Sequence, residues 1–199
     1  MVKHIIFDLG NVLVDIHPEL AMLAFTQRCN ISYQTVKTFF LSDLHLDFMA
    51  GKFSPDDFYQ LMIQKFLCNI SQNEFQSIWN LVIGDPKPGI EELINTLTEQ
   101  YTLSVCSNTD PWHWQVAMQK CSFFKHFYRF FLSFQLKMNK PNPEVFKTIL
   151  NELAVPAEKC LFIDDTKENI DQASQFGIKT IWTNSVEEMR QFFKEFNLI

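Results

Sequence analysis

Hydrophobic residues along the chain fall into five short, almost continuous runs that are separated by segments with helical periodicity. Such runs are typical of parallel strands covered on both faces, because a half-exposed strand alternates apolar and polar residues. The five predicted strands are Lys3–Phe7, Leu103–Ser107, Phe130–Ser133, Cys160–Ile163 and Lys179–Trp182. Helices are predicted between and after them at Gly89–Gln100, Pro143–Leu153 and Val186–Phe196. This alternation predicts an α/β fold with a doubly wound, Rossmann-like parallel sheet.

The stretch between the first two strands breaks this alternation and contains only helical patterns. The predicted helices are Pro18–Cys29, Ser32–Leu41, Pro55–Leu67 and Gln72–Leu81. Serines that are predicted helix N-caps are Ser32, Ser54 and Ser71. The segment Gly84–Gly89 is rich in glycine and proline and is predicted to be a linker. We therefore expect an α/β core made of residues 1–15 and 84–199, and an inserted all-helical cap domain made of residues 16–83, called the helical insert below.

Composition limits the partners that the protein is expected to have. The chain has 199 residues and a formal net charge of −6, so neither nucleic acid nor an anionic membrane is an expected partner. We expect no secretory signal peptide and no membrane-spanning segment. The five cysteines are odd in number and lack metal-type spacing, which favours reduced thiols in a cytoplasmic protein. The 21 phenylalanines are expected to pack in the core.

Asp8 directly follows the first predicted strand and stands two positions before Gly10. A hydrophobic strand that ends in a carboxylate delivers this group to the edge of the sheet where ligands bind in open α/β folds. An ordinary aspartate is ionised at neutral pH, so it can attack phosphorus and form an aspartyl-phosphate without an activating base. The alternative for Asp8 alone is a turn or helix-capping aspartate.

Two other segments offer groups that could bind a phosphate. Ser107 and Asn108 follow the second predicted strand, where a hydroxyl and the backbone N–H groups of the next helix can hold phosphoryl oxygens. Lys140 lies in a proline-flanked segment before a helix, where its ammonium can neutralise a phosphate and the nucleophile. The alternatives are a helix cap for Ser107 and a solvated surface side chain for Lys140.

Asp164 and Asp165 end the fourth predicted strand. Two adjacent carboxylates repel each other unless a cation lies near them, and oxygen ligands are those that Mg²⁺ prefers. Asn169 stands one helical turn after Asp165 and could support the pair. The alternative is a pair of solvated capping residues, and we favour the magnesium site.

These motifs, in this order along the chain, resemble the haloacid dehalogenase (HAD) superfamily of hydrolases in the branch with a helical cap after the first strand. The matching segments are Phe7–Leu13, Cys106–Thr109, Lys140–Phe146 and Phe162–Asn169. The form Asp-Leu-Gly-Asn-Val is similar to that of a branch containing bacterial sugar-phosphate phosphatases, including glucose-1-phosphate phosphatases. The resemblance implies that the cap excludes water and selects the substrate.

The resemblance also implies roles for individual residues. Asp8 is then the nucleophile, Ser107 binds the phosphate, and Lys140 steadies the phosphoryl group. Magnesium is held by Asp8, Asp165 and the carbonyl of Gly10, with Asp164 acting beside them directly or through water.

Gly10 departs from the phosphatase pattern, which has a second aspartate at this position. That aspartate protonates the leaving oxygen and later activates water, a type of help that typically contributes ~10²–10⁴-fold to the rate. Asp15 or His17, at the start of the helical insert, could replace it, although His17 could equally be an ordinary residue before a helix. A substrate with a good leaving group, such as an anomeric sugar phosphate, would need less protonation.

We expect a magnesium-dependent phosphatase that hydrolyses a small phosphorylated metabolite through an aspartyl-phosphate, and a sugar phosphate is one candidate for that metabolite. One alternative is a hydrolytic dehalogenase in which Asp8 attacks carbon, and the pair Asp164 and Asp165 argues against it because that reaction does not use a metal. The other alternative is a weakly catalytic or non-catalytic module that binds a phosphometabolite or another protein. This alternative stays open because Gly10 replaces the aspartate that serves as acid and base in the phosphatase pattern.

Overall fold

A computed structural model describes residues 1–199 of the chain. Its main sheet has five parallel strands in the order β5-β4-β1-β6-β7. These are β1 (His4–Phe7), β4 (Thr102–Ser107), β5 (Phe127–Leu132), β6 (Cys160–Asp164) and β7 (Lys179–Trp182). All five predicted strands are confirmed, and β5 begins three residues before the predicted Phe130. The chain moves outward from β1 in both directions, so the crevice for a ligand lies at the carboxyl end of β1.

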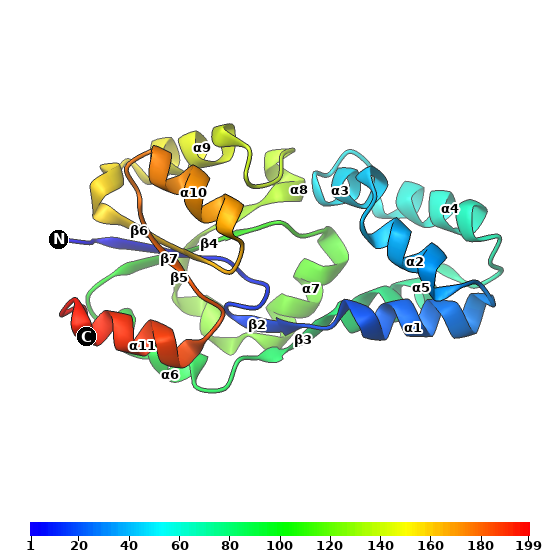
Figure 1. Cartoon of the computed structure of the whole chain (residues 1–199), viewed down its shortest axis with the longest axis horizontal. Coiled ribbons are helices and arrows are strands. Elements are labelled where there is room, and N and C mark those ends of the chain that lie inside the picture. Colours follow the sequence, from blue (N-terminus) through cyan, green and yellow to red (C-terminus); the bar gives the residue numbers. More distant parts are fainter.

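Helices cover both faces of this sheet (Figure 1). One face carries α6 (Ile90–Leu97), α7 (Pro111–Lys120) and α11 (Val186–Glu195), and the other carries α9 (Pro143–Leu153) and α10 (Lys167–Gln175). A short helix, α8 (Ser133–Leu136), follows β5. Alternate residues of β1 point to opposite faces: Ile5 and Phe7 belong to one buried cluster, and Ile6 belongs to the other. This two-sided burial explains the continuous apolar runs.

The helical insert contains α1 (Pro18–Cys29), α2 (Tyr33–Phe40), α3 (Asp43–Met49), α4 (Pro55–Phe66) and α5 (Gln72–Trp79). Figure 1 shows these five helices grouped at one end of the molecule. The hydroxyl oxygens of Ser32, Ser54 and Ser71 accept hydrogen bonds from backbone N–H groups at the starts of α2, α4 and α5. The predicted N-caps are therefore confirmed. Helix α3 was not predicted, because seven residues give too short a pattern to read.

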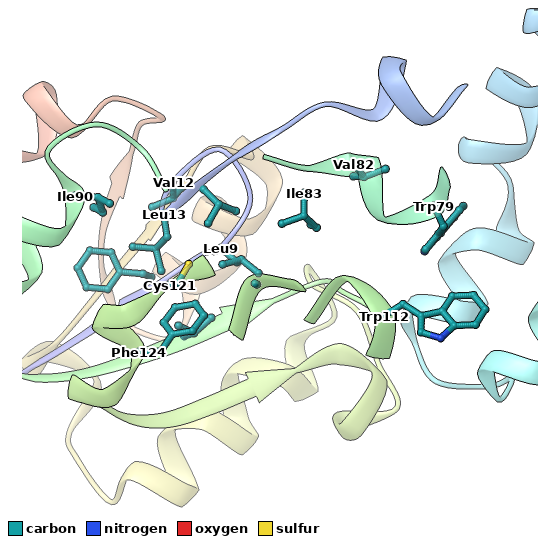
Figure 2. Packing of buried hydrophobic residues seen from close by; sticks show 14 of the residues in the cluster. Leu9, Val12, Leu13, Trp79, Val82, Ile83, Ile90, Trp112, Cys121 and Phe124 are labelled. Atoms are coloured by element: carbon teal, nitrogen blue, oxygen red, sulfur yellow. The ribbon is translucent and has the colours of Figure 1, made fainter. Parts of the chain in front are cut away.

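Aromatic side chains fill the interior of the helical insert. Phe48 and Phe58 stack with ring centroids 3.8 Å apart, and Phe58 meets Trp79 at 5.1 Å. The same buried cluster continues into the sheet face, and Figure 2 shows it running from Ile90 to Trp79 and Trp112. The expectation that phenylalanine serves core packing is confirmed for these side chains. None of the helices combines the length and the apolar content that crossing a membrane requires.

Two short antiparallel strands connect the insert to the core: β2 (Val14–Ile16) and β3 (Ile83–Pro86), which follows the 3₁₀ turn Asn80–Val82. The prediction of a linker at Gly84–Gly89 is therefore wrong for its first three residues. A Cβ on Gly84 would lie 2.8 Å from the Asp15 carbonyl oxygen, so glycine permits the close approach of the two strands. Glycine and proline, which usually mark a turn, are here part of the strand β3.

The prediction that all the cysteines are reduced is wrong for two of them. Cys29 and Cys68 form a disulfide, with their Cα atoms 5.0 Å apart, between the end of α1 and the segment that follows α4. Thirty-nine positions separate them in the sequence, and helix packing brings them together. The other three, Cys106, Cys121 and Cys160, are buried and unpaired. The expectation of a cytoplasmic protein rested in part on reduced cysteines, and this disulfide removes that part of its support.

Candidate active site

The carboxyl ends of two neighbouring strands, β1 and β6, bring the predicted acidic residues together. Phe7 is in register with Ile163 of β6 and with Val105 of β4, so the residues that follow each of them lie at the same level of the sheet. Asp8 thus neighbours Asp164 across the strands. Both side chains are buried, which requires that their charges be compensated locally.

Lys140 provides that compensation from the loop before α9. Its Nζ donates hydrogen bonds to Asp8 Oδ1 at 2.7 Å, to Asp164 Oδ2 at 2.6 Å and to the Cys106 carbonyl oxygen at 2.7 Å. Three acceptors use all three N–H donors of the ammonium. The alternative of a solvated surface lysine is wrong, because the Lys140 side chain is 2% exposed.

Burial and charge act in opposite directions on this cluster. Burial raises the pKa of Asp8 to about 7, Lys140 acts to lower it, and Asp164 acts to raise it further. Burial alone would lower the pKa of Lys140, but Asp8 and Asp164 hold it above its ordinary value. The lysine is therefore always charged, while Asp8 can gain a proton near neutrality when no other cation is present.

Three carboxylates at this edge fit a divalent cation. Oxygens of Asp8, Asp164 and Asp165 lie within 4.8 Å of one another. When all three are ionised they carry three negative charges against the single charge of Lys140, and hard oxygen donors suit Mg²⁺. The Gly10 carbonyl accepts none of the backbone hydrogen bonds formed outside helices and strands, so it is available as a further oxygen. The donor set is thus of the type that magnesium requires.

Side chains around the acidic pair hold it in place. Asn169 Nδ2 donates to both carboxylate oxygens of Asp164, at 3.0 Å each, and the Thr166 N–H donates to one of them at 2.8 Å. The sequence predicted Asn169 as a support one turn after Asp165; its contact is with Asp164 instead. Asp165 receives a hydrogen bond of 2.9 Å from Asn11 Nδ2. Both carboxylates are therefore oriented by amide donors.

The two predicted phosphate-binding residues at the carboxyl end of β4 have different contacts. Ser107 ends the strand and lines the cavity beside Asp8. The side-chain amide of Asn108 exchanges two hydrogen bonds with the backbone of Lys140, at 2.9 and 2.7 Å. Asn108 therefore fixes the lysine loop with its side chain.

The cavity over Asp8 has a volume of about 340 Å³. The core contributes its polar end, and the insert and its connecting strands contribute mainly apolar side chains such as Ile16, Met22 and Phe40. Asp15 and His17 do not line it. Ile16 does, and because successive strand residues point to opposite sides, its neighbour in β2, Asp15, is directed away.

Asp15 and His17 have partners elsewhere. The Asp15 carboxylate accepts a hydrogen bond from Lys87 at 2.9 Å, and His17 Nδ1 lies 3.5 Å from the Glu19 carboxylate. At Gly10, an added Cβ would lie 3.1 Å from Ile16 Cγ1. An apolar side chain thus occupies the surroundings of the position where the phosphatase pattern has an aspartate.

Two histidines, His45 and His113, also line the cavity, and no pattern in the sequence indicated a role for His45. His113 stands in α7, where Nδ1 meets Asp110 Oδ2 at 2.7 Å and Nε2 meets the Trp79 carbonyl oxygen at 2.9 Å. Burial would lower the pKa of His113, but the Asp110 carboxylate holds it above its ordinary value. The only sequence signal was the helix-start pattern Asp110-Pro111, and it gave no hint of contact with the insert.

Asp110→Ala is expected to destabilise the protein by about 3–5 kcal/mol, because it removes one partner of a buried charge pair. Asp110 is fully buried and also accepts a hydrogen bond from Trp79 Nε1 at 3.0 Å. The change leaves the charge of His113 and an indole N–H unpaired. Urea unfolding gives the measurement. Asp85→Ala is the control, since that side chain is 87% exposed, and a similar loss in both variants would contradict the prediction.

Sequence comparison identifies relatives with related chemistry. A family model described as haloacid dehalogenase-like hydrolase matches residues 5–183. The D-ribitol-5-phosphate phosphatase of Bacteroides thetaiotaomicron is 26% identical over 198 residues, which cover 96% of each chain. The phosphorylated carbohydrates phosphatase of Thermotoga maritima is 25% identical over 185 residues, covering 89% of this chain and 83% of that protein.

Comparison with solved structures finds enzymes of the same family as the sequence comparison does. A HAD family enzyme from Bacteroides thetaiotaomicron, solved in complex with magnesium and inorganic phosphate, has a TM-score of 0.82 and 26% identity, covering 92% of this chain and 94% of that chain. The shared fold, with its helical insert after the first strand, and the family match over most of the sequence lead to one assignment. The chain belongs to the haloacid dehalogenase-like hydrolase family.

Proposed function

We propose that the protein is a magnesium-dependent phosphatase that hydrolyses a small phosphorylated carbohydrate through an aspartyl-phosphate. The observation that carries the proposal is the buried cluster of Lys140 with Asp8 and Asp164, beside Asp165, at the floor of a cavity. A lysine and a divalent cation next to an aspartate suit an anionic phosphate ester. The substrates of the two phosphatase relatives, D-ribitol 5-phosphate and phosphorylated carbohydrates, support the substrate class.

In the proposed reaction Asp8 attacks phosphorus in line with the bond to the leaving oxygen. Ser107 binds a phosphoryl oxygen, and Lys140 offsets charge on the phosphoryl group and on the nucleophile. Water then cleaves the aspartyl-phosphate and releases inorganic phosphate. Asp8, Asp165 and the Gly10 carbonyl, with Asp164, would hold Mg²⁺, and the bound ion would supply positive charge near the transferring group.

The helical insert, residues 16–83, acts in this proposal as a cap over the core, residues 1–15 and 84–199. Three hydrogen bonds join carbonyl oxygens in and after α3 to core side chains. Ser133 Oγ donates to Met49 at 2.6 Å, Asn139 Nδ2 to Leu46 at 2.8 Å, and Lys137 Nζ to Gly51 at 2.8 Å. In this arrangement the insert shields the reacting groups from bulk water.

A phosphate-release assay tests the proposal. The purified protein is incubated with tetritol, pentitol and hexose phosphates, with Mg²⁺ or with EDTA. We expect release that depends on Mg²⁺ and is lost with EDTA. Absence of release from every phosphate would overturn the proposal, and chloride release from 2-chloropropionate without Mg²⁺ would favour the dehalogenase alternative instead.

Magnesium affinity is expected to rise with pH through about 7. The pKa of Asp8 in the metal-free protein is raised to about 7, mainly by burial, and only the ionised carboxylate binds a metal. Affinity should therefore be about tenfold weaker near pH 6 than near pH 8. Titration calorimetry with MgCl₂ at several pH values measures this. An affinity that stays constant between these pH values would contradict it.

A further inference from the structure

His45 is the titratable side chain of the cavity lining whose hydrogen bonding is incomplete. Of the other titratable side chains that line the cavity, Asp8 and Lys140 are joined in the acidic cluster, and His113 has partners on both ring nitrogens. His45 Nε2 is buried and has no hydrogen-bond partner. A buried polar atom without a partner is unfavourable, so the side chain is a candidate for contact with a ligand.

Geometry fixes the proton on the other nitrogen. His45 Nδ1 lies 2.9 Å from the carbonyl oxygen of Phe40, and a carbonyl can only accept, so Nδ1 carries the hydrogen. In the neutral ring Nε2 then presents a lone pair. Nε2 can therefore only accept a hydrogen bond, and its partner must be a donor such as a hydroxyl group.

The surroundings keep the ring neutral. Aromatic rings pack against it, with centroid distances of 5.5 Å to Phe40 and 5.2 Å to Trp79. Burial lowers the pKa of His45 and outweighs the hydrogen bond to the Phe40 carbonyl and the charge of Asp110, which act to raise it, while the charge of His113 acts to lower it further. The acceptor thus lies in an apolar wall, where a hydrogen bond discriminates more strongly than in water.

We propose that His45 is a specificity-determining residue whose Nε2 accepts a hydrogen bond from a hydroxyl group on the organic part of the substrate. The proposal rests on the proposed phosphatase function and deepens it, because it selects polyhydroxylated phosphates over alkyl phosphates of similar size. Helix α3 carries this acceptor from the insert, while the core holds the phosphate. The substrate is therefore read at two ends by two parts of the chain.

The test compares two phosphates and two substitutions. His45→Phe keeps a ring but removes the acceptor, and His45→Gln keeps an acceptor oxygen on a side chain of similar reach but without the ring. With ribitol 5-phosphate we expect His45→Phe to lower kcat/KM about tenfold, mostly through KM, because one hydrogen bond is lost. With n-pentyl phosphate, which has no free hydroxyl, kcat/KM should stay within about twofold of wild type. His45→Gln should recover part of the loss, and the exposed His126→Gln serves as the matched control.

Each other result overturns the inference. An equal loss for both phosphates in His45→Phe and His45→Gln indicates a structural role, and no loss for either indicates no role. If kcat falls with both ribitol 5-phosphate and n-pentyl phosphate but not with p-nitrophenyl phosphate, whose leaving group needs no proton, His45 protonates the leaving oxygen. If the wild type releases no phosphate, the proposed function fails on its own. Calorimetric binding of ribitol 5-phosphate to the magnesium-loaded wild type and to His45→Phe then decides the inference by the same tenfold criterion.

Discussion

Asp8→Asn is expected to lower the rate of phosphate release by roughly 10⁴–10⁶-fold, the loss typical of removing a catalytic nucleophile. The amide has nearly the shape of the carboxylate but does not attack phosphorus. Its oxygen can still accept the hydrogen bond that Lys140 now gives to Asp8 Oδ1 at 2.7 Å, so the fold should persist. Inorganic phosphate release with Mg²⁺ and the carbohydrate phosphate that performs best measures the effect, and circular dichroism checks the fold.

Asp171→Asn is the matched control for this experiment. Asp171 is exposed on α10, where it forms an ion pair with Lys167, and it does not line the cavity. It should retain activity within about twofold, as surface substitutions generally do. Equal activity of Asp8→Asn and the wild type would show that Asp8 is not the nucleophile.

Lys140→Met is expected to reduce both stability and activity. It leaves the buried carboxylates of Asp8 and Asp164 without their cation, and breaking a buried ion pair in this way costs about 3–5 kcal/mol. The rate should fall by roughly 10²–10³-fold, because a charge that stabilises the transferring phosphoryl group is lost. Urea unfolding with and without Mg²⁺ measures stability, and the added cation should restore part of it.

Lys147→Met provides the comparison for Lys140→Met. Lys147 is exposed on α9 and pairs with Glu144 on the surface, where ion pairs contribute little. Its substitution should change unfolding by no more than about 0.5 kcal/mol. Equal unfolding curves for both lysine variants would mean that the buried cluster does not depend on Lys140 for its charge balance.

The sheet and its ligand edge could be predicted because their signals are local. Each buried strand is a continuous apolar run, and the polar residue that ends it must reach the carboxyl edge. Asp8, Ser107 and Asp164 therefore lie where the sequence indicated, at the ends of β1, β4 and β6. Their roles in catalysis remain predictions.

Features that depend on packing between distant segments could not be predicted from the sequence. The disulfide between Cys29 and Cys68, and the contact of His113 with Trp79, join positions that no local pattern relates. His45 lies on a helix too short to be recognised. The direction of side chains around Ile16 follows from a three-residue strand, and such a short strand has no readable alternation.

The bond between Cys29 and Cys68 also limits how the molecule can open. It ties α1 to the segment after α4, so the three helices between them cannot swing away from α1 independently. We therefore expect a passage wide enough for a sugar-sized molecule to open by rotation of the insert as one body, with the torsion falling on the paired strands β2 and β3.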